Sequence, residues 1–446
     1  MTVEALEGLL AQDENETQAG NYFISNYPPF SFWKPEESTH LETVLDQPPA
    51  AEAPVLGLYY HIPFCRKRCR FCYFKVYTDK NAKEIGRYLE ATFHEAEQYA
   101  VRPYLQGRMP KFVYFGGGTP SYLSPAQLER VFGALREAFD WSAVEEVAFE
   151  AEPGTLNEKK VQALRALGVT RLSLGIENFD DAILENNGRA HRSPEVFKAL
   201  DWVQAAGFDS VNIDLIAGMV GETEENWQRC VEKTLEIAPE SVTIYQMEVP
   251  FNTTIYKEMQ SSGSAAAPVA DWKTKRRWVA EAFARLEEAG YHIGSAYTAV
   301  KDPETTQFLY RDELWTGADL LGMGVASFGH LGGVHYQNVS EFGQYCDALE
   351  GGESAVSRAL LTTPEERLMR EMLLQFKLGY LEPPYFQEKF GADILERFGD
   401  GFSVLENRGL AKISEARIQL NREGLLRIDN LLHAFFLQQH TGARYT

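Results

Sequence analysis

Three cysteines lie within eight residues of one another, in a chain of 446 residues that has only five. Cys65, Cys69 and Cys72 form the pattern CxxxCxxC in the stretch LYYHIPFCRKRCRFCYFK, directly after a short apolar run. Structural zinc usually takes four ligands, often in paired spacings, and only His61 lies near enough in the sequence to be the fourth. Three thiolates suit a [4Fe-4S] cluster better, because they hold three of its irons and leave one open. The spacing therefore predicts a cluster, with zinc as the alternative.

An iron with an open position can bind a second molecule. S-adenosylmethionine can chelate it through its amino and carboxylate groups, and one electron from the cluster can then release a 5′-deoxyadenosyl radical. The protein supplies position and shielding for this chemistry. The same loop carries five basic residues, which would favour the reduced cluster and attract an acidic electron donor such as flavodoxin, or would form a solvated surface. They are Arg66, Lys67, Arg68, Arg70 and Lys75.

The composition restricts the classes of function. The net charge of −21 disfavours nucleic-acid binding, which depends on neutralising phosphates. No apolar run approaches the roughly 20 residues that a membrane span requires. The acidic first residues lack the basic and apolar parts of a signal peptide. Together with the odd number of cysteines, these features predict a cytoplasmic protein without a disulfide framework. We expect a monomer that acts on a small molecule.

The elements that must position the cysteines alternate between strand and helix. Seven short apolar runs predict strands at 55–61, 111–116, 146–152, 171–177, 210–218, 241–249 and 291–296. Amphipathic stretches predict helices at 84–100, 125–140, 158–168, 194–207, 224–238 and 275–290. Such alternation is typical of a parallel sheet covered by helices. We therefore predict an α/β fold with a full or partial β/α barrel, whose chemistry lies at the carboxyl ends of the strands.

Changes in composition and in the pattern of predicted strands and helices divide the chain into four segments. Residues 1–54 are polar and aromatic and predict an irregular N-terminal arm and linker, with a disordered tail as the alternative. Residues 55–300 form the barrel core, and residues 301–356 are a connecting segment that completes it. Residues 357–446 combine helices with two short strands and predict a winged-helix-like module. Such modules usually bind DNA, but on an acidic chain attached to a catalytic barrel a lid over the substrate is at least as well supported.

Several motifs resemble those of one enzyme family. The segments HIPFC, CRFC, GGGTPSYL, RLSLGIENF, NIDLIAG and LLGMGVASFG occur in this order. The order and residue types resemble the oxygen-independent coproporphyrinogen III oxidases, which are radical S-adenosylmethionine (radical SAM) enzymes. The resemblance extends over nearly the full length and includes the arm segment NYFISNYPPF. Related heme chaperones and radical methyltransferases that use two molecules of S-adenosylmethionine belong to the same broad family.

The resemblance implies contacts to the methionine part of the cofactor. Gly117, Gly118 and Thr119 follow the second strand, where consecutive glycines allow a ligand to approach the backbone closely; an ordinary turn is the alternative. Arg189 matches an arginine expected to pair with the methionine carboxylate. Glu150 could accept hydrogen bonds from a ribose or an ammonium group; otherwise it is a solvated loop acid.

Further residues complete the predicted site. Asp214, in the fifth strand, needs a partner there and is expected to face the ligand together with Ile216. Tyr245 could stack on an adenine, with core packing as the alternative. Phe71, between the last two cysteines, could cover the adenine and shield the cluster. By resemblance, the Tyr59 side chain lies near the catalytic centre.

Three departures from the family pattern bear on the reaction. Phe74 stands where the coproporphyrinogen oxidases typically have a further cysteine, and the arm lacks their arginine. Glu177 replaces their usual glutamine, which removes an amide donor and adds charge at a position expected to contact the cofactor or take part in catalysis.

These changes lead us to expect a methyltransferase that uses two molecules of S-adenosylmethionine and acts on an sp2 carbon of an aromatic, quinone or polycyclic substrate. One alternative is oxidative decarboxylation of coproporphyrinogen III, a tetrapyrrole. Another is a heme chaperone, although chaperones of this kind usually have tryptophan at the position of Phe64.

Overall fold

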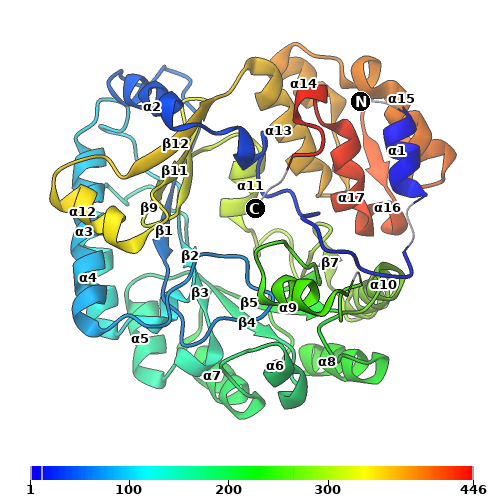
Figure 1. Ribbon diagram of the computed structural model, residues 1–446, viewed down its shortest axis with the longest axis horizontal. Helices are drawn as coiled ribbons and strands as arrows, with labels where there is room; N and C mark the ends of the chain where they lie inside the picture. Colours follow the sequence, from blue (N-terminus) through cyan, green and yellow to red (C-terminus); the bar gives the residue numbers. More distant parts are fainter. Residues whose placement is uncertain (1–2, 12–13, 265, 444–446) are drawn as a thin grey trace.

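The computed structural model describes residues 3–11, 14–264 and 266–443, and its frame is a twelve-stranded sheet. Six parallel strands form the centre of the sheet in chain order (Figure 1). They are β1 (Leu56–Ile62), β2 (Phe112–Gly117), β3 (Glu146–Ala151), β4 (Arg171–Glu177), β5 (Ser210–Ala217) and β6 (Ser241–Gln246). Their carboxyl ends therefore meet at one edge, as the sequence predicted.

Strands from later in the chain extend the sheet at both sides. β9 (Asp319–Met323) pairs in parallel with β1, and antiparallel β10 (Phe328–Leu331), β11 (Val334–Asn338) and β12 (Val356–Leu361) follow it. Beyond β6 lie β8 (Thr298–Val300) and β7 (His292–Ile293), both in antiparallel pairing. Within the described residues β12 and β7 are the two ends of the strand order, so the barrel is partial.

Helices cover the outer face of the parallel strands (Figure 1). They are α3 (Ala82–Ala100), α4 (Pro125–Ala138), α5 (Glu158–Ala166), α6 (Asp181–Asn186), α7 (Ser193–Ala206), α8 (Glu224–Ile237) and α10 (Trp272–Glu288). The predicted capping box at the start of α4 is present: Ser124 Oγ accepts from the Gln127 backbone N–H at 3.3 Å, and Gln127 Oε1 accepts from the Ser124 N–H at 2.9 Å. Such a cap fixes the residue at which the helix begins, and with it the end of the preceding loop.

The C-terminal part forms a second layer beside the sheet. It contains α13 (Pro364–Phe376), α14 (Pro383–Phe390), α15 (Ile394–Asn407), α16 (Arg422–Leu426) and α17 (Ile428–Leu432). Three short antiparallel strands, β13 (Tyr380–Leu381), β15 (Ile418–Leu420) and β14 (Ala411–Ile413), complete this winged-helix-like module. In the described part of the chain, no helix has the length and apolar character needed to cross a membrane.

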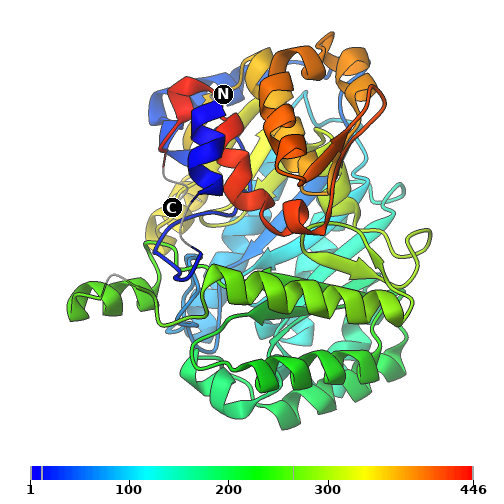
Figure 2. The same cartoon turned by 90° about the vertical axis from the view of Figure 1, so that its right-hand side faces the viewer.

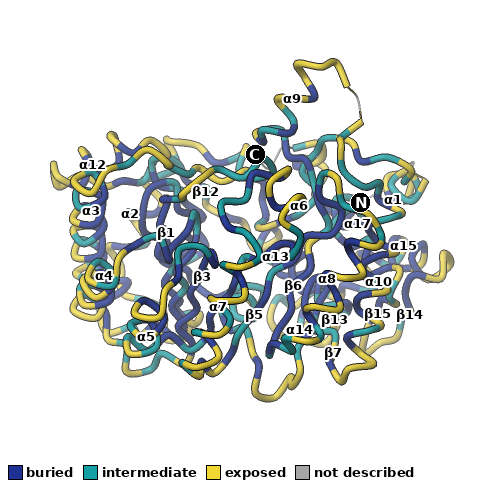
Figure 3. Tube along the Cα trace, turned by 90° about the horizontal axis from the view of Figure 1, so that it is seen from below, coloured by how far each residue is buried: buried dark blue, intermediate teal, exposed yellow. Residues whose placement is uncertain are grey.

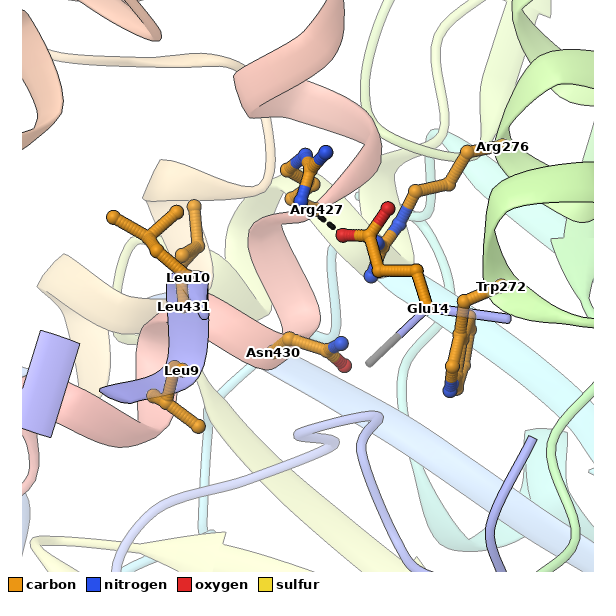
Figure 4. A pocket seen from close by; sticks show the side chains of 8 residues that line it. All are labelled: Leu9, Leu10, Glu14, Trp272, Arg276, Arg427, Asn430 and Leu431. Atoms are coloured by element: carbon orange, nitrogen blue, oxygen red, sulfur yellow. Dashed lines mark hydrogen bonds and ion pairs between the residues drawn. The ribbon is translucent and has the colours of Figure 1, made fainter. Parts of the chain in front are cut away.

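The N-terminal arm packs against both layers. It contains α1 (Val3–Leu10) and α2 (Ser38–Leu45), separated by an irregular stretch. Leu6, Ile24 and Tyr27 are fully buried in a core shared with the C-terminal helices. Glu14 accepts hydrogen bonds from Arg276 of α10 and from Arg427, and so ties the arm to both layers (Figure 4). The arm is therefore a packed part of the fold rather than a disordered tail.

One helix stands out from the body. α9 (Thr254–Ser262) follows β6 and projects from the molecule in two views (Figures 2 and 3). Its base contacts the cysteine loop, because the Ile255 N–H donates to the Arg70 carbonyl at 3.2 Å and the Asn252 side chain donates to the Tyr73 carbonyl at 2.8 Å. The segment after β6 thus supports the cysteine loop from the side.

Candidate active site

The cysteine loop begins at the carboxyl end of β1. Backbone hydrogen bonds close it: the Cys65 N–H donates to Tyr77 O at 3.0 Å, and the Cys72 N–H donates to Cys69 O at 3.2 Å. All three thiols are partly accessible and free of disulfides. Burial raises the pKa of Cys65 to about 11 and that of Cys72 to about 12. Both are therefore neutral thiols at neutral pH until a metal displaces their protons.

The surroundings of the thiols fit a [4Fe-4S] cluster. The described residues contain no group of three or more His, Cys, Asp or Glu side chains placed to hold a metal ion. In a [4Fe-4S] cluster each thiolate binds a different iron, so the sulfurs stand apart. The Thr119 hydroxyl donates to Cys65 Sγ and the Arg189 guanidinium to Cys69 Sγ, both at 3.3 Å. Such donors stabilise thiolate ligands.

His61 is not placed to be a fourth ligand. Its Nδ1 lies 2.9 Å from the Tyr59 hydroxyl, and its Nε2 is buried without a hydrogen-bond partner in the described structure. Burial lowers the pKa of His61 to about 4, so the ring is neutral at neutral pH. The pair fixes the Tyr59 phenol on β1, and its predicted place near a catalytic centre stays a prediction.

The glycine loop after β2 runs along the cysteine loop. The Gly118 N–H donates to Ile62 O at 2.8 Å and the Thr119 N–H to Phe64 O at 2.9 Å. At Gly117 φ is 110°, and a Cβ there would lie 2.4 Å from His61. Only glycine fits this position without strain or a clash. The predicted glycines therefore let the second loop approach the first.

Three buried carboxyl groups lie on successive strands: Glu150 and Glu177 near the carboxyl ends of β3 and β4, and Asp214 in the middle of β5. Burial raises the pKa of Glu150 and of Glu177 to about 7 and that of Asp214 to about 6. Glu150 accepts from the Tyr114 hydroxyl at 2.5 Å and from the Gly117 N–H at 3.2 Å. Groups that titrate near neutral pH can accept or donate hydrogen bonds, which suits ribose hydroxyls and an ammonium group.

Arg189 connects these acids to the cysteine loop. One Arg189 nitrogen lies 3.5 Å from Glu177 Oε1, and the same side chain donates to Gly175 O and Cys69 Sγ. Glu177 itself has φ of 67°, a left-handed conformation that is uncommon for a residue with a side chain. The predicted pairing of Arg189 with a methionine carboxylate remains a prediction.

The predicted adenine contacts lie together on an apolar surface. Phe71 packs against a buried cluster that contains Ile216, Met219 and Met247. Tyr245 is the parallel neighbour of Ile216 across β5 and β6, and 40% of its surface is accessible. Burial nevertheless raises the pKa of Tyr245 well above 10.

The structure adds aromatic and polar residues that the sequence did not single out. The Tyr114 and Tyr310 rings stack with centroids 4.1 Å apart, and the Tyr59 ring lies 6.0 Å from that of Tyr114. His191 lies 2.9 Å from Glu152 and 3.1 Å from the Ile176 carbonyl, and so fixes the loop that carries Arg189. Tyr114 and Gly116 alternate along β2, and this period of two was the available signal that Tyr114 faces the site.

The basic residues of the cysteine loop are largely paired. The Arg66 side chain lies 3.2 Å from Glu195, Lys75 donates to Glu341 at 2.6 Å, and Arg70 pairs with Glu258 of α9. Arg68 donates to the Cys72 carbonyl at 3.1 Å and so supports the loop itself. Much of the predicted positive charge is thus balanced by acids, and docking of flavodoxin stays a prediction.

Residues 59–234, which contain the cysteine loop and the acids, match the radical SAM superfamily. The chain is thus similar to the radical SAM superfamily over this segment. It is 29% identical to an oxygen-independent coproporphyrinogen III oxidase of Synechocystis, over 94% of this chain and 93% of that protein. It is 28% identical to the heme chaperone HemW of Lactococcus lactis, over 85% of this chain and 97% of that protein. These relatives do not support the methyl-transfer hypothesis.

The fold has a solved counterpart. Coproporphyrinogen III oxidase (HemN) from Escherichia coli superimposes with a TM-score of 0.79 and 24% identity, over 94% of this chain and 99% of that one. In a radical SAM domain a [4Fe-4S] cluster with S-adenosylmethionine supplies a 5′-deoxyadenosyl radical. Here Cys65, Cys69 and Cys72 would hold the cluster, and the glycine loop, the acids and Arg189 would orient the nucleotide.

Proposed function

We propose that this radical SAM enzyme acts on a tetrapyrrole and oxidatively decarboxylates propionate side chains, as in the conversion of coproporphyrinogen III to protoporphyrinogen IX. The observation that carries the proposal is the end-to-end relationship to the Synechocystis oxidase, which covers 94% of this chain and 93% of the relative. That similarity includes the arm and the C-terminal module as well as the cluster-binding core. These parts pack together around the opening of the sheet, where a large substrate would enter.

The side chains around Tyr59 suit a substrate that carries several pyrrole rings. Tyr59, Tyr114 and Tyr310 form an aromatic wall on the inner face of the sheet, and Tyr245 and Tyr73 keep 40% and 37% of their surface accessible. Aromatic faces can stack on single pyrrole rings of a tetrapyrrole, at about 0.5–1.5 kcal/mol for each favourable ring pair beyond area burial.

The remaining finer assignments follow from this proposal. We place the domain limits at residues 54, 300 and 356, and we assign the module of residues 357–446 a role as a cover over the substrate rather than in DNA binding. A reduced flavodoxin is the proposed electron donor, and the protein is proposed to act as a cytoplasmic monomer. Two molecules of S-adenosylmethionine per protein remain the proposed stoichiometry.

Anaerobic reconstitution with iron and sulfide tests the proposed reaction. The reconstituted protein is incubated with S-adenosylmethionine, a reductant, a one-electron acceptor and coproporphyrinogen III. We expect 5′-deoxyadenosine, carbon dioxide and a product that has lost carboxyl groups. S-adenosylhomocysteine together with a methylated product would refute decarboxylation and restore the methyl-transfer hypothesis. The matched control is Cys72→Ala, which should form none of these products.

A heme chaperone is the second candidate, because the Lactococcus relative shares 28% identity over 85% of this chain. Stoichiometric heme binding without turnover of coproporphyrinogen III would favour that function over the proposed one. Both assays use the same reconstituted protein, so the two functions can be compared directly.

A further inference from the structure

A buried arginine in α13 forms no ion pair with any described residue. Arg370 is 5% exposed. Burial lowers the pKa of Arg370, and the charges of Glu371 and Asp319 oppose that shift. Its Nε donates to Asn26 Oδ1 at 2.8 Å, and its two terminal nitrogens make no hydrogen bond to the described chain. A buried guanidinium is costly unless an anion lies against it. The other buried arginine at the arm, Arg276, has Glu14 for this purpose.

A histidine with a free ring nitrogen belongs to the same network. His330 Nδ1 lies 3.0 Å from His335 Nδ1, and His335 Nε2 lies 3.0 Å from the Tyr27 carbonyl. A carbonyl only accepts, so His335 Nε2 donates, and Nδ1 of the neutral His335 ring accepts from His330 and from Asn26, whose amide lies at 3.2 Å. His330 is 7% exposed, and its Nε2 makes no hydrogen bond to any described residue.

Asn26 links the histidines to the arginine. Its amide nitrogen faces His335 and its oxygen accepts from Arg370, so one side chain of the arm sets the positions of both. Burial lowers the pKa of His330 well below its ordinary value, and the charges of Arg370 and Arg367 lower it further. The uncommitted donors of Arg370 and the ring of His330 therefore lie within one electrostatic neighbourhood.

This neighbourhood adjoins the inner face of the sheet. His330 lies opposite Leu320 of β9, and Leu320 packs in one cluster with Tyr59 and Tyr310. Tyr310 lies on α11 (Leu309–Trp315), which packs against α13. Burial raises the pKa of Tyr310, the Glu150 charge raises it further and the Arg370 charge lowers it. The charges of Glu150 and Arg370 thus both act on Tyr310.

We propose that Arg370 and His330 form a carboxylate-binding subsite for the substrate, at the end of the aromatic wall away from the cysteine loop. The planar guanidinium can grip a carboxylate through two parallel hydrogen bonds, and His330 can donate a third from Nε2 when it binds a proton with the anion. That the carboxylate is a propionate of a tetrapyrrole rests on the proposed function. The subsite then holds one end of the macrocycle while another propionate reaches Tyr59.

Equilibrium dialysis of the reconstituted full-length protein tests the subsite. The ligands are coproporphyrin III, its neutral tetra-amide, 2-naphthoate and 2-naphthamide. The variants are Arg370→Gln, Arg370→Lys, His330→Gln and, as the control, Arg417→Gln, an exposed arginine paired with Glu382. A lost hydrogen bond to a charged group costs about 1.5–3 kcal/mol, so Arg370→Gln should weaken coproporphyrin III binding roughly 10- to 100-fold. The amide affinities and the control should change less than about threefold.

The outcomes separate this proposal from the proposed function. If coproporphyrin III binds the wild type and Arg370→Gln equally well, the subsite is wrong and the tetrapyrrole substrate stands. If the wild type binds no coproporphyrin III but binds 2-naphthoate through Arg370, the tetrapyrrole is wrong and the subsite stands. Binding of neither acid overturns both. If Arg370→Gln does not fold, unchanged coproporphyrin III affinity in both Arg370→Lys and His330→Gln overturns the subsite.

Discussion

The replacement Glu177→Gln tests whether burial raises the pKa of this carboxyl group. Glu177 is 9% exposed, and burial raises its pKa from an ordinary 4.5 to about 7, although the Arg189 charge opposes the shift. Below pH 4.5 the carboxyl is neutral in both the folded and the unfolded chain. As the pH rises from 4.5 to about 7, the unfolded chain loses the proton first. This group therefore makes the folded state progressively less stable across that range.

The size of the change in the free energy of unfolding follows from the shift in the pKa of Glu177. Raising the pKa from 4.5 to about 7 corresponds to about 3 kcal/mol, at 1.36 kcal/mol for each tenfold change. Glutamine keeps the shape of the side chain but does not titrate. Asp214 and Glu150 also raise the pKa of Glu177, so part of this free energy comes from repulsion between the three acids. We expect the stability of Glu177→Gln relative to wild type to rise by about 2–3 kcal/mol between pH 5 and pH 8.

Urea unfolding of the metal-free protein, measured without oxygen at several pH values, provides the assay. Removing the Glu177 carboxylate beside Arg189 also costs stability by an amount that does not depend on pH. This cost changes the stability difference between variant and wild type by a constant and leaves its slope with pH unchanged. Glu137→Gln, at an exposed position on α4, is the matched control and should show no slope. A difference between Glu177→Gln and wild type that stays constant from pH 5 to pH 8 would show that Glu177 is ionised throughout and that the reasoning is wrong.

Three other changes test the site. Gly117→Ala should lower S-adenosylmethionine affinity at least about tenfold in equilibrium dialysis, because φ is 110° and a Cβ would lie 2.4 Å from His61. The control is Gly133→Ala on α4, where no atom lies within 4 Å of the added Cβ, and its affinity should not change. Tyr59→Phe leaves both nitrogens of buried His61 unpaired and should cost about 1–3 kcal/mol in urea unfolding at pH 7; unchanged stability would mean that water replaces the phenol. Iron and sulfide analysis should show normal cluster content in Cys346→Ala and almost none in alanine variants of Cys65, Cys69 and Cys72; substantial iron in any of the latter would contradict the ligand assignment.

The sequence by itself determined the chemistry of the cofactor side and the type of fold. The spacing of Cys65, Cys69 and Cys72 is local, so it specifies a cluster before any tertiary contact is known. The alternation of strands and helices is also local, and it predicted Glu150 and Glu177 at the ends of successive parallel strands and Asp214 within the next one. Because parallel strands bring their carboxyl ends to one edge, we expected these acids to face one ligand.

Only the tertiary structure decided which distant residues complete the site. Arg370 and Asn26 are 344 positions apart in the sequence and meet because the arm packs between the sheet and α13. Tyr310 reaches Tyr114 from α11, a helix much further along the chain and just before β9. Periodicity reports which face of an element is buried but not which element covers it. The sequence shows that Arg370 is charged. That no described residue forms an ion pair with Arg370 depends on packing between segments that no local pattern connects.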